Sequence, residues 1–151
     1  MSTKATNPKD AIASNKLPTH LVPYTVTVNA TLAFAEGAFK YGAYNWRVAG
    51  VRASVYRSAI DRHLEKWWNG EWADPKTGVP HLANVIACAG IILDAKEVGK
   101  LTDDRPPAAP ASRVIDEQEK VIAALRALFA DQNPKQFTIA DTADDMKEFA
   151  R

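Results

Sequence analysis

The sequence predicts an all-α fold, and three features of the chain support this class. Apolar residues recur at helical spacing in several separate runs. Residues that commonly cap or terminate helices stand at the ends of these runs. The segment Tyr24–Val28 alternates in the manner of a short strand, but no obvious partner strand occurs elsewhere in the sequence. We therefore expect a bundle of helices.

The size and charge of the chain limit what it can be. Its 151 residues suit one domain, and 46% hydrophobic with 25% charged residues allow a buried core in a soluble protein. The net charge is +1, and basic residues are interleaved with acidic ones, so we expect no direct nucleic-acid binding. Cys88 is the only cysteine, which excludes an intrachain disulfide and fits a reducing cytoplasm. No apolar run is long enough to span a bilayer, so we expect no membrane partner.

Residues 1–24 are polar and are interrupted by three prolines. We expect an irregular arm that docks on the body through its apolar side chains, and the alternative is a disordered tail. The anchors of the docked arm would be Ile12, Leu17, Leu21 and Val22.

Residues 25–100 are expected to form the helical core. The first helix would be capped by Asn29 or Thr31 and would stop near Gly42, because glycine readily adopts the backbone conformation that ends a helix. The second helix would occupy residues 55–69, where apolar side chains recur at helical spacing.

Ser54 is the expected cap of this second helix, and the pair Asn69–Gly70 would end it. A polar loop would follow over residues 71–78. Pro80 would lie in the first turn of a third helix, where a proline costs no hydrogen bond, and Gly99 would close that helix.

The remainder would be a proline-rich linker, residues 101–111, and a C-terminal helical segment, residues 112–151. Ser112 would cap an amphipathic helix that is broken at Asn133–Pro134, and a short helix would follow over residues 142–149. The apolar stripe of the amphipathic helix must be buried on the body or on a second subunit. We therefore expect a homo-oligomer, either a dimer or a tetramer.

Several polar residues on or beside the core helices are candidates for a binding site. Glu36 and Lys40 are four residues apart, so they share one face of the first helix. They can form a surface ion pair of little energetic value. Alternatively, the carboxylate binds a divalent cation while the ammonium group binds phosphate.

The turn after the first helix contains Tyr44, Asn45, Trp46 and Arg47. Its aromatic rings can cover the end of the core. Alternatively, they stack on a base while Asn45 hydrogen-bonds to the edge of that base and Arg47 binds phosphate.

The second helix carries Arg62, His63 and Trp67, which can contact a substrate. A single histidine on a helix is more often a core residue than a ligand. His63 and Glu65 are two residues apart, so only one of them can face a pocket.

Glu71 and Asp74 lie in the loop that precedes the third helix, and carboxylates there can hold Mg²⁺. His81 and Asn84 are three residues apart at the start of that helix. They can cap it, or they can form one wall of a metal and phosphate site, because a helix N-terminus attracts anions. A zinc site made by His20, His63 and His81 is disfavoured, because no pair has the close spacing of such sites.

Eight blocks of the sequence form a recognisable set: Asn7–Asp10, Leu21–Pro23, Gly37–Arg47, Val55–Tyr56, Arg62–Leu64, Trp67–Glu71, Gly78–Leu82 and Asp103–Pro106. Together they resemble the phage dATP/dGTP diphosphohydrolase family, which is MazG-like. Within it they are most similar to the MazZ type, from phages that replace adenine with 2-aminoadenine. The resemblance covers roughly residues 7–107 and is specific only as a set.

This resemblance implies a MazG-like helical bundle that is completed by oligomerisation. It implies hydrolysis of dGTP, with dATP as a further substrate, between the α and β phosphates. The cofactor would be Mg²⁺ or Mn²⁺, with two or more ions. The products would be dGMP, for synthesis of 2-aminoadenine DNA in the host cytoplasm, and pyrophosphate.

Under this hypothesis, the catalytic residues would be Glu36, His63, Glu71 and His81. The metal ligands would be Glu36, Glu71, Asp74, His81 and Asn84. The substrate-binding residues would be Lys40, Tyr44, Asn45, Trp46, Arg47, Arg62 and Trp67.

The chain departs from the acidic pattern typical of MazG-like enzymes, which is Glu-x-x-Glu on one helix and Glu-x-x-Asp on the next. The second motif has His81 and Asn84 instead, and the first motif is not intact either. Two other classes of function therefore stay open: a non-catalytic nucleotide sensor and a helical interaction module. An enzyme acting on a modified or pyrimidine nucleotide is a further alternative.

Overall fold

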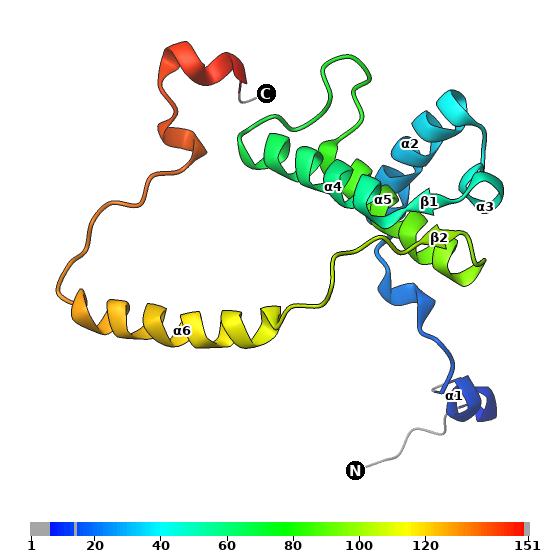
Figure 1. The fold of residues 1–151 in the computed structure, drawn as a ribbon, viewed down its shortest axis with the longest axis horizontal. Helices are drawn as coiled ribbons and strands as arrows, with labels where there is room; N and C mark the ends of the chain where they lie inside the picture. The colour runs from blue at the N-terminus through cyan, green and yellow to red at the C-terminus, as the bar shows by residue number, and fades with distance from the viewer. Residues whose placement is uncertain (1–6, 14, 150–151) are drawn as a thin grey trace.

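A computed structural model describes residues 7–13 and 15–149, and the regular secondary structure of this part is helical apart from one short pair of strands (Figure 1). The α-helices are α1 (Pro8–Ala13), α2 (Tyr24–Tyr41), α3 (Trp46–Ala49), α4 (Ala53–Trp68), α5 (His81–Glu97) and α6 (Ala111–Leu128). The strands are β1 (Val51–Arg52) and β2 (Leu101–Thr102), and the short 3₁₀ helices are η1 (Thr19–Leu21), η2 (Ile139–Asp141) and η3 (Asp144–Phe149). The predicted all-α class is confirmed. In the described part of the chain, no helix is both long and apolar enough to cross a membrane.

Helix α5 is the centre of the fold, because it packs against both α2 and α4. Small side chains line the junction between α2 and α5, where Ala33, Ala83 and Ala87 are buried together with Val79. Small residues allow two helix backbones to approach closely, which brings polar groups on neighbouring helices within reach of one another. A second buried cluster, Trp46, Val51 and Ala95, fixes the other end of α5.

Helix α2 begins earlier than the sequence suggested. Its first residue is Tyr24, so the alternating segment at its start is helical and not a strand. Asn29 and Thr31 do not cap the helix, because their side chains donate hydrogen bonds to carbonyl oxygens four residues earlier within it. Gly42 ends α2 as predicted, with a φ of 89°.

The two strands were not expected, and they tie the proline-rich segment to the core. They pair in parallel, with Val51 opposite Leu101 and Arg52 opposite Thr102. Residues 101–102 therefore belong to the folded body, and the expectation that the linker begins at residue 101 is wrong.

The N-terminus of α4 is capped from this same segment. The carboxylate of Asp104 accepts hydrogen bonds from the backbone N–H of Ser54, at 2.8 Å, and from its hydroxyl, at 2.5 Å. Ser54 lies inside the helix, which begins at Ala53, so the prediction that Ser54 is the cap is wrong. Asp104 satisfies an N–H group that has no partner within the helix.

The ends of the other core helices follow the predicted signals. Helix α4 ends just before Asn69, and Gly70 has a φ of 103°. Pro80 is the N-cap residue of α5, which starts at His81, so it lies one position before the first turn in which it was expected. Gly99 lies just beyond the end of α5 with a φ of 67°, as predicted.

The N-terminal arm does not dock on the body of the single chain. The expected anchors Ile12, Leu17, Leu21 and Val22 are each more than half exposed. Figure 1 shows α1 apart from the bundle of α2, α4 and α5. The expectation of a docked arm is therefore wrong for one copy of the chain.

Helix α6 also lies apart from the bundle (Figure 1). It begins at Ala111, so Ser112 lies in its first turn and is not the cap. Its apolar side chains are between 43% and 73% exposed: Val114, Ile115, Val121, Ile122, Leu125, Leu128 and, just beyond the helix, Phe129. The short helix expected over residues 142–149 is the 3₁₀ helix η3, residues 144–149.

Candidate functional site

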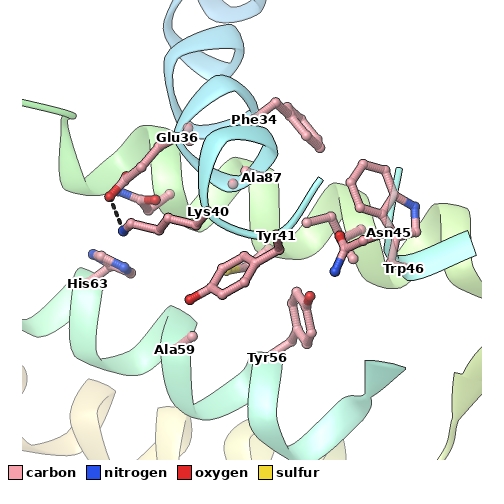
Figure 2. Close-up of a pocket in the computed structure, with 15 residues that line it drawn as sticks. Phe34, Glu36, Lys40, Tyr41, Asn45, Trp46, Tyr56, Ala59, His63 and Ala87 are labelled. Atoms are coloured by element: carbon pink, nitrogen blue, oxygen red, sulfur yellow. Dashed lines mark hydrogen bonds and ion pairs between the residues drawn. The ribbon is translucent and has the colours of Figure 1, made fainter. Parts of the chain in front are cut away.

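A cavity of about 250 Å³ lies between α2, α4 and α5, beside the turn that leads into α3. Figure 2 shows Glu36, Lys40 and His63 on one side of it and Phe34, Asn45, Trp46 and Tyr56 on the other. The cavity therefore has a charged side and an aromatic side. Asn84 of α5 also lines it.

Helix α2 supplies the charged groups. Glu36 and Lys40 are one helical turn apart and form an ion pair that lines the cavity. The hydrogen bond to Glu36 raises the pKa of the Lys40 ammonium group above its usual value. A carboxylate and an ammonium group thus stand side by side at one end of the cavity, where they can bind a cation and an anion respectively.

His63 of α4 faces the same cavity and belongs to a chain of three hydrogen-bonded side chains. Its Nδ1 lies 2.9 Å from Nδ1 of His81, and Nε2 of His81 lies 2.7 Å from Oε1 of Glu71. His81 is fully buried. Burial, with smaller contributions from His81 and Lys66, lowers the pKa of His63 below its usual value, so its ring is neutral at neutral pH.

The loop between α4 and α5 positions the hydrogen-bonded side chains of His63, His81 and Glu71. The backbone N–H of His81 donates to the carbonyl oxygen of Trp72, at 3.0 Å, and an isolated bridge joins Ala73 to Pro80. Glu71 precedes this bridged segment and reaches the buried ring of His81 from it. Both ring nitrogens of His81 make hydrogen bonds to protein groups. No nitrogen lone pair of His81 is therefore free to bind a metal ion, as had been expected of this residue.

Asp74 stabilises the loop between α4 and α5 and does not line the cavity. Its Oδ1 accepts hydrogen bonds from the backbone N–H groups of Lys76, at 2.9 Å, and Thr77, at 3.2 Å. These bonds are the main reason that the pKa of Asp74 is lowered. Asp74 is not among the residues that line the cavity.

The donors available to a metal ion are few in this part of the chain. Among residues 7–13 and 15–149, no three His, Cys, Asp or Glu side chains are arranged to hold a metal ion. Glu36 is the acidic side chain that lines the cavity, and the amide of Asn84 is a second oxygen donor there. Mg²⁺ commonly keeps several waters and is bound by one or two carboxylates together with substrate phosphates. The cavity fits a cation that arrives with a phosphate ligand, and it does not fit a cage built by protein alone.

The turn before α3 is organised by Asp94 of α5. The indole Nε1–H of Trp46 donates to Asp94 at 2.6 Å, and the guanidinium group of Arg47 donates to both oxygens of Asp94 at 2.8 Å. These bonds, above all those from Arg47, lower the pKa of Asp94 to about 2. Arg47 is therefore engaged by a carboxylate and not directed toward the first cavity.

A second, more apolar cavity of about 440 Å³ lies on the other side of α2. Tyr44 and Arg47 line this second cavity, and the guanidinium carbon of Arg47 lies 4.8 Å from the centre of the Tyr44 ring. The residues of the turn that was expected to bind the substrate are thus divided between the two cavities. Asn45 lines the first cavity, Tyr44 and Arg47 line the second, and Trp46 contributes to both.

Two other predicted substrate-binding residues on α4 lie away from both cavities. Arg62 is exposed, and Trp67 packs against Trp68 with ring centres 5.9 Å apart. Neither of them lines the first or the second cavity.

The lining residues of the first cavity that the sequence analysis did not assign to the site include Phe34, Tyr41, Tyr56 and Cys88. A usable signal existed for two of them. Tyr56 lies seven residues before His63 on α4, and Cys88 lies four residues after Asn84 on α5. Side chains at these spacings share a helix face, so each could have been assigned to the cavity with its partner.

A sequence model of the family described as dATP/dGTP diphosphohydrolase, N-terminal, matches residues 6–105. The matched region contains every residue that lines the two cavities, and it includes the segment from which Asp104 caps α4. Helix α6 lies outside it. No curated protein and no solved structure matches the chain.

Proposed function

Because the chain belongs to the dATP/dGTP diphosphohydrolase family, we propose that it hydrolyses dGTP, and dATP as a second substrate, to the nucleoside monophosphate and pyrophosphate. The observation that supports this proposal is the first cavity, which combines a carboxylate, an ammonium group and a neutral imidazole at one side with aromatic rings at the other. Such a combination suits a ligand that has a charged phosphate end and a flat base.

The phosphate end would lie beside Glu36 and Lys40. Glu36 and Asn84 would hold a Mg²⁺ or Mn²⁺ ion carried by the triphosphate, and that ion supplies positive charge that offsets the phosphate charge. Lys40, which is half exposed, can then turn from Glu36 to a phosphate oxygen without leaving a buried charge unpaired.

The base end would lie between aromatic side chains. Tyr41 and Tyr56 approach the cavity from α2 and α4, and Asn45 adds an amide that can donate to and accept from the edge of a purine. Trp46 is almost fully buried and is held by Asp94, so it shapes the wall of the cavity as a rigid group.

A panel of nucleotides tests the proposal directly. The full chain is incubated with dGTP, dATP, dCTP or dTTP and with Mg²⁺ or Mn²⁺, and the products are identified by ³¹P NMR. We expect dGMP and pyrophosphate, with the highest kcat/KM for dGTP and a lower one for dATP. Release of orthophosphate instead of pyrophosphate, or the absence of any product, would contradict the proposal.

A non-catalytic nucleotide sensor is the second candidate. The observation that favours it is the lack, within the described residues, of a group of three His, Cys, Asp or Glu side chains that could hold a metal ion. The same panel separates the two functions. A sensor would be stabilised against thermal unfolding by dGTP and would leave the nucleotide intact.

A further inference from the structure

We propose that Glu71 and His81 are positioning residues that hold His63 in one tautomer, so that its free Nε2 accepts a proton from the water that attacks the triphosphate. This inference rests on the proposed function and deepens it by naming the proton acceptor. It also gives Glu71 and His81 a role other than metal binding.

The hydrogen bonds determine where the protons lie. Ionised Glu71 can only accept, so the ring nitrogen Nε2 of His81 must carry the proton in the 2.7 Å contact between them. A neutral His81 then has an unprotonated Nδ1. The 2.9 Å contact between the two Nδ1 atoms needs one proton, and that proton must therefore belong to His63. A neutral His63 that is protonated at Nδ1 has a free lone pair at Nε2.

The surroundings of His63 keep this lone pair available. Its side chain lines the cavity, and its Nε2 makes no hydrogen bond to any residue in the described part of the chain. The charged and titratable groups that face the ring come from α2, from α4 itself and from α5: Glu36, Arg62, Lys66 and His81. Burial is the largest cause that lowers the pKa of His63. The ring is thus neutral and able to take up a proton at neutral pH.

The proposed reaction is a displacement at phosphorus by water. The oxygen of water forms a bond to the attacked phosphorus. The bond between that phosphorus and the bridging oxygen breaks, and its electron pair leaves with pyrophosphate. The proton of the water passes to Nε2 of His63. The Nδ1 proton of His63 can pass to His81, where the new positive charge lies beside the Glu71 carboxylate.

Burial makes this arrangement effective. His81 has no contact with solvent, so its ring orientation is fixed by its two hydrogen bonds and by the helices around it. The Glu71 carboxylate is partly exposed and lies 3.9 Å from Nζ of Lys66, so the buried partner in the pair is His81. A base whose orientation is set by a third group is the usual arrangement for activating a nucleophile.

The test compares Glu71→Gln with Glu65→Gln in the full chain. Glu65 is exposed on α4, two residues from His63, and does not line the cavity. The first measurement is the ¹⁵N NMR spectrum of the histidine rings without nucleotide or metal. We expect wild type and Glu65→Gln to show His63 unprotonated at Nε2. In Glu71→Gln, the amide can donate to His81 and reverse both hydrogen bonds, so the resonance of His63 Nε2 should shift toward the protonated form.

The second measurement is steady-state hydrolysis of dGTP. We expect Glu71→Gln to lower kcat by about 10- to 100-fold, a part of the factor that a positioned base contributes. KM and the Mn²⁺ concentration for half-maximal rate should stay as in the wild type. Glu65→Gln should match the wild type in all three quantities.

Each contrary result has a distinct meaning. The inference is overturned if His63 of the wild type is protonated at Nε2, or if Glu71→Gln leaves its tautomer unchanged. It is also overturned if Glu71→Gln mainly raises the Mn²⁺ requirement, since Glu71 would then be a metal ligand. A wild-type chain that hydrolyses no triphosphate refutes the proposed function instead, and this is established before the variants are compared. The wild-type spectrum decides the tautomer even if a variant does not fold.

Discussion

Glu36 is the acidic side chain that lines the first cavity within the described chain, so the proposed chemistry depends on it. Replacing it with Gln keeps its size and removes the charge that would hold a cation. We expect kcat/KM for dGTP to fall by about 100- to 1,000-fold, as when one group that stabilises developing charge is lost. The free energy of unfolding should change by less than about 1 kcal/mol, because the partner Lys40 is half exposed. Steady-state kinetics and urea denaturation measure the two effects.

Glu65→Gln is the matched control for this prediction, because Glu65 is exposed and lies outside the cavity. An active Glu36→Gln enzyme would remove Glu36 from the phosphate site. A loss of activity with a large loss of stability would show a structural role for Glu36 instead.

Asp94 links stability to pH. Arg47 and Trp46 lower the pKa of Asp94 from the usual 3.8 to about 2. Between these values the Asp94 carboxylate is protonated in the unfolded chain but stays ionised in the folded chain. Its contribution to stability is therefore present above about pH 4 and is lost as the pH falls toward 2. We expect Asp94→Asn to be less stable than the wild type at pH 7 and similar to it near pH 2. Urea denaturation across this range measures the difference, with exposed Asp116→Asn as the control.

The individual site residues could be predicted where the signal was local. Glu36 and Lys40 were assigned to one face by their helical spacing, and the structure puts both at the cavity. Arg47 could not be placed this way, because the carboxylate that engages it lies 47 residues away. Similarly, nothing in the local sequence indicates that His63 and His81 meet, since two helices must pack before their rings can touch.

At the scale of elements, the position of α4 depends on a cap supplied from a distance. Asp104 is expected to stabilise the start of α4 through its bonds to Ser54, as a helix cap does. Asp104→Ala should lower the free energy of unfolding, as measured by urea denaturation. Asp103→Ala is the control and should lower it less, because Asp103 pairs with the exposed side chain of Arg105 and not with a helix N-terminus. Equal effects of the two substitutions would argue against capping.

The turn between α3 and β1 requires a glycine. Gly50 has a φ of 80°, and a Cβ there would lie 2.9 Å from the carbonyl oxygen of Lys100. Gly99 has a similar φ of 67° but open space around it. We expect Gly50→Ala to be more destabilising than Gly99→Ala by at least about 1 kcal/mol, because it adds overpacking to the same backbone strain. Equal losses in thermal or urea unfolding would refute this difference.

The ends of the core helices were the most predictable elements, whereas α6 ends at Leu128, five residues before the break expected at Asn133–Pro134. Gly42, Gly70 and Gly99 act at short range and were found where the sequence indicated. The start of α4 depends on Asp104, 50 residues away from Ser54 in the sequence. The two-residue strands are too short to show a period, so pairing between residues 51–52 and 101–102 could not be read from the sequence.

At the scale of the molecule, the apolar stripe of α6 is exposed along the helix. A helix with such a stripe gains stability only by burying it, and the body of the same chain does not cover it. We propose that a second copy of the chain does so. Light scattering of the full chain should give a dimer or a tetramer, and the double variant Val121→Asp, Leu125→Asp should give a smaller species. Ala127→Asp, on the opposite face of α6, should keep the wild-type mass. A monomeric wild type would contradict the proposal.

Two cavities flank α2, and only the one with Glu36, Lys40 and His63 should take the nucleotide. The most direct test is an NMR titration of the ¹⁵N-labelled full chain with a non-hydrolysable α,β-imido analogue of dGTP and Mg²⁺. The largest backbone shifts should occur at Glu36, Lys40, His63 and Asn84, and they should saturate with the ligand. Shifts concentrated at Thr31, Ala43 and Gly90 around the second cavity, or no saturable shift at all, would contradict the account.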